Sequence, residues 1–309
     1  MADKSAFIAL LGRANVGKSS LLNSLIGQKV SIVSDKPQTT RTRIMGVLTR
    51  GDEQYVFIDT PGFHKPKNLL DSKMNGAISG GMTDVDVAVL IVDAAPSFKF
   101  DPDNLPAAEI ELLENIKSRK LPCILVINKI DLLEQKDELF EIITAYASKY
   151  NFAAVVPLSA KTGEGTEILL KELGVFQHNA PHYFLDDDFT DQPEKIMVSE
   201  MIREKLLFLL QKEVPHGIAV DIERFFETDN KDGEPLVNID AVIFCERESH
   251  KGIIIGKGGA LLKRAGTLAR RDIEKFFGTK VSLKLWVKVK ENWRNRESII
   301  RSLGLDSLT

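Results

Sequence analysis

The sequence predicts an α/β domain with a mainly parallel sheet, followed by a smaller α+β domain. Continuous apolar runs at 6–11, 85–92 and 122–127 are typical of strands buried on both faces, and stretches with helical spacing alternate with them. An acidic, proline-containing stretch at 177–193 interrupts this alternation, and elements in a different order follow it. With 309 residues, the chain is long enough for two domains of ordinary size.

In the first domain, the strand at 6–11 leads into a glycine loop and a helix at 18–26. Residues 43–49 and 54–58 alternate as strands do, and Gly51 between them favours a hairpin, which makes the sheet mixed rather than wholly parallel. The remaining elements that we expect are strands at 85–92, 122–127 and 152–158 and helices at 109–117, 136–149 and 166–173. The predicted sheet is therefore mixed and six-stranded.

The second domain is expected to begin with a helix at 194–211 and strands at 217–226 and 236–245, which a turn at 229–233 separates. A glycine loop at 256–259, a helix at 260–277, a strand at 280–289 and a short terminal helix complete it. These elements divide the chain into a first domain at 1–176, a linker at 177–194 and a second domain at 195–309.

Positive charge is concentrated near the end of the chain. The formal net charge is −3, but residues 247–301 carry 15 Lys and Arg against 5 Asp and Glu, a balance of +10 that leaves −13 for the remainder. Such a block is the electrostatic footprint of a polyanionic partner. A solvated helix face is the alternative, which charge alone does not exclude.

Several protein classes are disfavoured. The apolar runs fall well short of the ~20 residues that a membrane-spanning helix needs, and the first residues lack the apolar core of a signal peptide. The two cysteines, Cys123 and Cys245, lie in apolar, strand-like runs, so we expect buried free thiols rather than a disulfide or a metal site. This usage is typical of a reducing cytoplasm.

A nucleotide-binding motif follows the first strand. The segment Gly12–Ser19 fits G-x-x-x-x-G-K-[ST], in which backbone N–H groups and a helix N-terminus cradle phosphates. Lys18 is expected to reach the β- and γ-phosphates, and the Ser19 hydroxyl is expected to bind Mg²⁺. The residues predicted to contact the nucleotide here are Gly12, Arg13, Ala14, Asn15, Val16, Gly17, Lys18, Ser19 and Ser20.

A second motif predicts guanine as the base. The sequence Asn128-Lys129-Ile130-Asp131 follows a buried strand, where Asp131 can accept hydrogen bonds from the N1–H and the exocyclic amine of guanine. Adenine offers neither donor in that arrangement, which opposes an ATPase. Lys129 is expected over the base plane, and the backbone of Ser159, Ala160 and Lys161 at the base oxygen. Without the upstream motif, residues 128–131 could equally form a helix-capping turn.

Two further segments predict the switch. In Asp59-Thr60-Pro61-Gly62, Asp59 is expected to hold Mg²⁺ through water, and the Gly62 N–H to bind the γ-phosphate. Within Gln38–Arg41, Thr40 can close the Mg²⁺ shell only when the γ-phosphate is present, which orders the loop in the GTP state. Lys18, Thr40, Asp59 and Gly62 are therefore the predicted catalytic residues. Phe63 occupies the position where Ras-like enzymes place a water-orienting glutamine, which predicts slow hydrolysis.

A G-x-x-G loop at Gly256–Gly259 lies in the basic block. We expect it between a strand and a helix, with Ile253–Ile255 before it, so that a nucleic-acid backbone can approach closely while apolar neighbours receive bases. A plain glycine turn is the alternative. Trp286 and Trp293 are interpreted as packing residues. The predicted RNA contacts are Lys251, Gly252, Ile253, Ile254, Ile255, Gly256, Lys257, Gly258, Gly259, Lys263, Arg264, Arg270 and Arg271.

Together these motifs resemble the Era family of bacterial GTPases over nearly the whole chain. The resemblance rests on the segments 12–19, 38–41, 59–66, 128–131, 159–161, 183–193 and 252–259. It implies a Ras-like P-loop GTPase domain of the TRAFAC class followed by a type II KH domain. It also implies binding to the 3′ end of 16S rRNA, a role in maturation of the 30S subunit, and partial association with the inner membrane. We further expect the protein to be a monomer.

The resemblance carries residue-level implications as well. An apolar residue at Phe63 is usual in the family, and Asn15 matches an asparagine that binds potassium in related GTPases. Ala14 departs from the common proline, and Arg264-Ala265-Gly266 departs from the usual Lys-x-Ile-Gly. A membrane-associated or protein-binding GTP switch in cell-cycle control remains the alternative function, although a shaped glycine loop is not needed to bind lipid.

Overall fold

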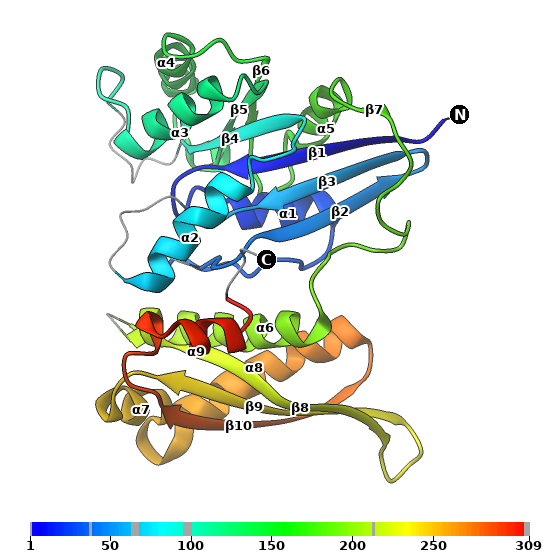
Figure 1. Ribbon diagram of the computed structural model, residues 1–309, viewed down its shortest axis with the longest axis vertical. Coiled ribbons are helices and arrows are strands. Elements are labelled where there is room, and N and C mark those ends of the chain that lie inside the picture. Colours follow the sequence, from blue (N-terminus) through cyan, green and yellow to red (C-terminus); the bar gives the residue numbers. More distant parts are fainter. Residues whose placement is uncertain (1, 37–38, 63–67, 95–100, 212–213, 306–309) are drawn as a thin grey trace.

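In the computed structural model of the chain, residues 2–36, 39–62, 68–94, 101–211 and 214–305 are described. The chain forms two domains, one above the other in Figure 1, and helix α6 (Glu194–Leu209) of the second domain faces the first. Among these residues, no helix combines the length and apolar character that crossing a bilayer requires.

The first domain is built on a mixed sheet with strand order β2-β3-β1-β4-β5-β6. The strands are β1 (Lys4–Leu11), β2 (Ile44–Arg50), β3 (Glu53–Asp59), β4 (Val87–Asp93), β5 (Cys123–Asn128) and β6 (Ala154–Leu158). Only β2 pairs antiparallel with its neighbour along this path, through the predicted hairpin in which Gly51 has a φ of +64°. The prediction of a mixed α/β sheet is confirmed.

Helices cover both faces of this sheet. Helices α1 (Lys18–Ile26) and α5 (Thr166–Gly174) pack on the face that receives Ile8 and Leu10, as the alternation of β1 requires. On the opposite face, which receives Ala9 and Leu11, lie α2 (Leu69–Gly80), α3 (Ala107–Ser118) and α4 (Lys136–Ala147). Sequence patterning predicted these helices except α2.

The stretch that we assigned to the linker is partly structured. Its residues His178–Asn179 form a two-residue strand, β7, which pairs antiparallel with β1 and adds a seventh strand to the sheet. Further along, the buried Gln54 side chain accepts hydrogen bonds from the N–H groups of Tyr183 (2.8 Å) and Phe184 (3.1 Å). The segment therefore runs along the first domain before it enters α6 (Figure 1).

The second domain has a three-stranded sheet with the order β10-β9-β8. Its elements after α6 are β8 (Ala219–Asp229), β9 (Pro235–Cys245), α7 (Glu248–Ile255), α8 (Ala260–Phe277), β10 (Lys280–Val289) and α9 (Glu297–Ser302). Helices α6, α7 and α8 contribute Ile202, Ile254 and Ala269 to one core on the sheet. The other core joins the sheet to Trp293, α9 and the α2 helix of the first domain.

One element of this domain differs from expectation. We expected the G-x-x-G loop between a strand and a helix, but residues 248–255 form helix α7, so the loop connects two helices. Three consecutive isoleucines favour a strand locally, yet Ile254 is fully buried in the core beneath the helix. Tertiary packing therefore overrides the local β preference.

Candidate functional site

The loop between β1 and α1 has the shape of a phosphate cradle. Gly12 and Gly17 have φ values of +151° and +99°, which disfavour any other residue. A Cβ atom at Gly12 would lie 2.4 Å from the Ile91 carbonyl oxygen, and one at Gly17 would lie 2.2 Å from Nδ2 of Asn128. Both glycines are required because neighbouring strands approach the loop backbone closely.

The Lys18 side chain is buried at the centre of this loop. Its Nζ atom donates to the carbonyl oxygens of Gly12 (3.0 Å) and Arg13 (2.9 Å). Burial lowers the pKa of Lys18 to about 8, and the charge of Asp59 opposes that shift only in part. A poorly solvated ammonium is a strong binding partner for a phosphate group that replaces these carbonyls.

Three oxygen-bearing side chains meet beside Lys18. The Ser19 hydroxyl donates to Oδ2 of Asp59 at 2.8 Å and lies 2.9 Å from Oγ1 of Thr40. Oδ1 of Asp59 is buried and has no hydrogen-bond partner among the described residues, and burial raises the pKa of this carboxyl. Such a set of hydroxyl and carboxylate oxygens fits Mg²⁺, which would neutralise triphosphate charge when bound.

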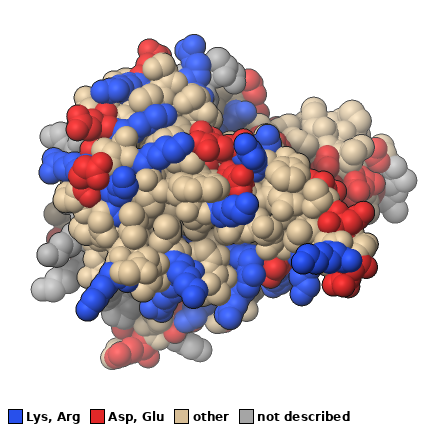
Figure 2. Space-filling view, turned by 90° about the horizontal axis from the view of Figure 1, so that it is seen from below, with Lys and Arg blue, Asp and Glu red and all other residues tan. Residues whose placement is uncertain are grey.

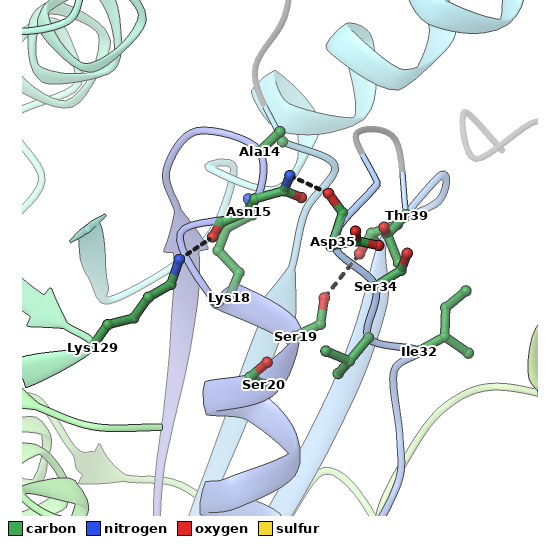
Figure 3. A pocket seen from close by; sticks show the side chains of 14 residues that line it. Ala14, Asn15, Lys18, Ser19, Ser20, Ile32, Ser34, Asp35, Thr39 and Lys129 are labelled. Atoms are coloured by element: carbon green, nitrogen blue, oxygen red, sulfur yellow. Dashed lines mark hydrogen bonds between the residues drawn. The ribbon is translucent and has the colours of Figure 1, made fainter. Parts of the chain in front are cut away.

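A cavity of ≈ 320 Å³ lies over the loop (Figure 3). Across it, Nδ2 of Asn15 donates to the Asp35 carbonyl oxygen at 2.7 Å, and Lys129 reaches the Asn15 carbonyl oxygen at 2.9 Å. The residues that line it are Ala14, Asn15, Gly17, Lys18, Ser19, Ser20, Ile32, Val33, Ser34, Asp35, Thr39, Thr40, Gly62 and Lys129. Sequence reasoning missed residues 32–35, because no motif marks that part of the chain, and within the segment 38–41 it assigned a role to Thr40 but none to Thr39.

The predicted base-binding segments lie together at one end of the sheet. Asn128 connects them, since its Nδ2 donates to the Val16 carbonyl oxygen (2.7 Å) and its Oδ1 accepts from the Ala160 N–H (2.9 Å). The Ser159 hydroxyl donates to Oδ1 of Asp131 at 2.6 Å. Asp131 is exposed, so its carboxylate can meet a base that enters from solvent.

Some predicted positions are placed otherwise. The Arg13 side chain contacts the buried Glu109 of α3, with Nε 2.5 Å from Oε1, so only the backbone of Arg13 is left for the cradle. Gln38 and the segment 63–66, including Phe63, lie outside the described residues. Both cysteines are buried free thiols, as predicted.

The G-x-x-G loop of the second domain presents an open backbone. Gly256, Gly258 and Gly259 have φ values of +73°, +57° and +78°. A Cβ atom at Gly258 or Gly259 would meet none of the described residues within 4 Å, whereas one at Gly256 would lie 2.8 Å from Cβ of Leu261. Gly258 and Gly259 therefore leave room for a ligand, and Gly256 is needed for packing.

The predicted RNA contacts divide by exposure. The exposed ones are Gly252, Ile253, Lys257, Gly258, Lys263, Arg264, Arg270 and Arg271, and the partly exposed ones are Lys251, Ile255, Gly256 and Gly259. Ile254 is 0% exposed, so its side chain supports the core and does not face RNA. From the side of the second domain, a row of Lys and Arg side chains crosses the lower part of the molecule (Figure 2).

The two tryptophans differ. Trp293 is fully buried and its indole N–H donates to the Gly217 carbonyl oxygen at 2.9 Å, as expected of a packing residue. Trp286 is 44% exposed on β10, which the expectation of packing did not anticipate.

Comparisons with known proteins place the chain in a family. GTPase Era of Clostridioides difficile (strain 630) is 47% identical to it over 301 residues, which cover 97% of this chain and 98% of that protein. This chain belongs to the Era family. GTPase Era of Caldanaerobacter subterraneus subsp. tengcongensis is also 47% identical, over 98% of each chain. As a member of this family of GTPases, the chain hydrolyses GTP to GDP and phosphate.

Family models and solved structures agree with this assignment. Residues 7–129 match the model described as 50S ribosome-binding GTPase, and residues 213–294 match the KH domain. The structure is similar to that of Era in complex with MgGDPNP and nucleotides 1506–1542 of 16S ribosomal RNA, with a TM-score of 0.91, 35% identity and coverage of 98% of this chain and 99% of that chain. A point variant of Aquifex aeolicus Era bound to GDP·AlF4⁻ superposes with a TM-score of 0.90 at 35% identity, over 98% of this chain and 99% of that chain. Since each match spans both domains, the two domains are arranged as in those Era structures.

A Gly17→Ala substitution is expected to weaken GDP binding at least ~10-fold and to lower the free energy of unfolding by about 1–3 kcal/mol. The new methyl group would collide with Asn128, which holds the cradle to the base-binding loops, and would strain a positive φ. Calorimetry and thermal unfolding measure the two effects. Gly27→Ala is the control because Gly27 also has a positive φ, +76°, but a Cβ atom there would have no described residue within 4 Å. If Gly17→Ala and Gly27→Ala lost equal amounts of GDP affinity and of unfolding free energy, backbone strain alone would explain the effect.

Nucleotide affinity of this Era-family protein is expected to fall as pH rises above about 8, by up to ~10-fold per pH unit. The bound phosphates favour the charged form of Lys18, so binding takes up a proton once the free amine has lost its own. Below the pKa of about 8 the amine is already protonated and affinity should stay level. Calorimetry in buffers with different ionisation enthalpies measures the proton uptake. No uptake on the alkaline side would contradict this account of Lys18.

Proposed function

We propose that this Era-family GTPase binds the 3′ end of 16S rRNA and acts as a nucleotide-controlled factor in maturation of the small ribosomal subunit. The observation that carries the proposal is the full-length match to a relative crystallised with MgGDPNP and nucleotides 1506–1542 of that RNA. In this chain the matching KH domain has an open glycine loop between two helices, and this loop lies within the basic block. A backbone cleft of this kind suits a single-stranded nucleic acid.

We assign the following roles to the main predicted residues of the nucleotide site. Lys18 neutralises the β- and γ-phosphates, Ser19 and Thr40 bind Mg²⁺, Asp59 holds it through water, and the Gly62 N–H binds the γ-phosphate. Asn128, Lys129 and Asp131 select guanine together with the backbone of Ser159, Ala160 and Lys161. This proposal is supported by the convergence of Ser19, Thr40 and Asp59 and by the bond from Ser159 to Asp131.

A potassium ion at Asn15 is a further part of the proposal. The Asn15 side chain lines the cavity and bonds to the Asp35 carbonyl oxygen, so it lies where a monovalent cation could meet the triphosphate. Turnover in potassium chloride should exceed turnover in sodium chloride at equal ionic strength. Equal rates would remove the ion from the proposal.

RNA recognition is tested with the full-length protein and an RNA of nucleotides 1506–1542. The RNA should bind more tightly with GDPNP than with GDP, and an RNA of the same composition in scrambled order should bind weakly. Vesicles of anionic phospholipid provide the competing ligand, since a basic block also attracts lipid. Binding to vesicles without binding to the RNA would favour the membrane-associated switch instead.

We also propose that the protein works in the cytoplasm as a monomer, and that a fraction of the molecules binds peripherally to the inner face of the inner membrane. The basic block of 247–301 supports a peripheral electrostatic contact. Fractionation at low and high salt tests this, because an electrostatic contact weakens as salt is added.

A further inference from the structure

Arg41, the residue after Thr40, extends its side chain from the first domain into the second. The Arg41 guanidinium donates from Nη1 to the Ile218 carbonyl oxygen at 2.7 Å and from Nη2 to the His216 carbonyl oxygen at 3.1 Å. Its central carbon lies 5.7 Å from the centre of a Trp293 ring. The residue is 3% exposed, so the second domain encloses this side chain almost completely.

The residue before Thr40 is held from the same side. Arg203 of α6, which is 1% exposed, donates from Nη2 to the Thr39 carbonyl oxygen. Glu200 holds that guanidinium through Nε at 2.7 Å. The second domain therefore contacts the chain immediately before and immediately after Thr40.

The same helix also holds the start of this loop. Oε1 of Glu204 accepts the Val33 N–H at 3.0 Å, and its Oε2 lies 2.5 Å from Nζ of Lys29. Lys29 in turn lies 2.9 Å from Asp272 of α8, the helix that follows the G-x-x-G loop. The segment from Val33 to Arg41, part of which lines the nucleotide cavity, is thus held at both ends by the second domain.

Simple adhesion between domains does not require this arrangement. The Arg41 guanidinium meets two carbonyl oxygens and a ring, but its Nε has no partner among the described residues. Burying a charged group with incomplete hydrogen bonding costs free energy, so this contact is a poor means of stabilising the interface alone. The placement of Arg41 next to Thr40 has a specific consequence. Thr40 has little freedom to leave Ser19, from which its Oγ1 lies 2.9 Å, while both neighbours are held.

We infer that Arg41 is a positioning residue for Thr40, so that the docked second domain, through Arg41 and Arg203, holds the pocket in its triphosphate-binding form. The inference rests on the proposed role of Thr40 at the Mg²⁺ site. Because Thr40 serves only when a γ-phosphate is present, loss of Arg41 affects retention of the triphosphate and leaves GDP retention almost unchanged.

The test compares dissociation of GDPNP and of GDP from full-length Arg41→Met, Arg41→Lys and wild-type protein in magnesium. GDPNP should leave Arg41→Met roughly 10-fold faster, and GDP within about 2-fold of wild type. GDPNP should leave Arg41→Lys more slowly than Arg41→Met, because an ammonium can reach one of the two carbonyls. Hydrogen exchange at residues 39–42 should be slowest in the wild type, faster in Arg41→Lys and fastest in Arg41→Met. This readout does not depend on turnover.

Arg50→Met is the matched control. Arg50 is exposed, pairs only with Glu167 of the first domain among the described residues, and should leave both rates unchanged. Should Arg41→Met fail to fold, Arg203→Gln carries the same test from the other domain. Unchanged GDPNP dissociation, or equal acceleration for GDPNP and GDP, would overturn the inference. If wild-type protein itself retained GDPNP no better with magnesium than without, the role of Thr40 would fall instead.

Discussion

An Asp131→Asn variant is expected to lose GTP affinity by ~10⁴ and to bind xanthosine triphosphate in its place. The Asp131 carboxylate can accept from both N–H donors of guanine, whereas an asparagine amide turns one of these contacts into a donor facing a donor. Xanthine carries an oxygen at the position of the guanine exocyclic amine and restores the match. The Ser159 hydroxyl can still donate to the amide oxygen of the variant, so the loop should keep its shape.

Competition against a fluorescent GDP analogue measures both affinities in one experiment. Asp137→Asn is the matched control, because Asp137 is another exposed aspartate, in the first turn of α4 and outside the segments 128–131 and 159–161 that we assign to the base. It should leave the preference for guanine intact. Retention of a guanine preference by Asp131→Asn would remove Asp131 from base recognition.

A Gly258→Asp variant is expected to weaken RNA binding by two to three orders of magnitude at low salt. A Cβ atom at Gly258 would have no neighbour within 4 Å in the part of the chain that the structure describes, so the carboxylate would project into the space where we place the RNA backbone. Repulsion between two charges ~4 Å apart amounts to about 4 kcal/mol at an effective dielectric constant near 20. Added salt should narrow the difference from wild type.

Gly258→Asn separates charge from backbone strain. Gly258 has a φ of +57°, a conformation that Asn and Asp both tolerate better than most residues, and the two side chains have nearly the same shape. The Asn variant should therefore lose less than ~10-fold in RNA affinity. Equal losses in both variants would indicate a damaged loop rather than repulsion of a phosphate.

Much of the fold follows from local patterns. The helices at 18–26 and 260–277 and the strand at 280–289 occur at the predicted residues. Each has an unbroken pattern, a glycine flanks each helix at both ends, and the strand begins two residues after Gly278. Helix α7 and strand β7 were not predicted from the sequence, each for a different reason. Helix α7 contains three isoleucines that locally favour a strand, and β7 is a two-residue strand that pairs with the part of β1 before its contact with β4.

The candidate sites likewise combine features that local sequence predicts with features that depend on tertiary contacts. The phosphate cradle could be predicted because its residues are contiguous and their backbone alone sets its shape. Ser19, Thr40 and Asp59 were each assigned to Mg²⁺ by motif, but their meeting depends on the sheet that brings β3 beside β1. Ile254 was misassigned because exposure depends on which side of α7 meets the core.

The chemistry of this protein follows from its residues alone: a guanine nucleotide cradle, a glycine loop in a basic domain, and their order along the chain. How the two domains contact each other depends on their docking in three dimensions. Arg41 binds the His216 and Ile218 carbonyls more than 170 residues away, and the acceptors are backbone atoms that every residue type carries. Such a contact leaves no pattern in the sequence, because it arises from the docking of two separately folded surfaces.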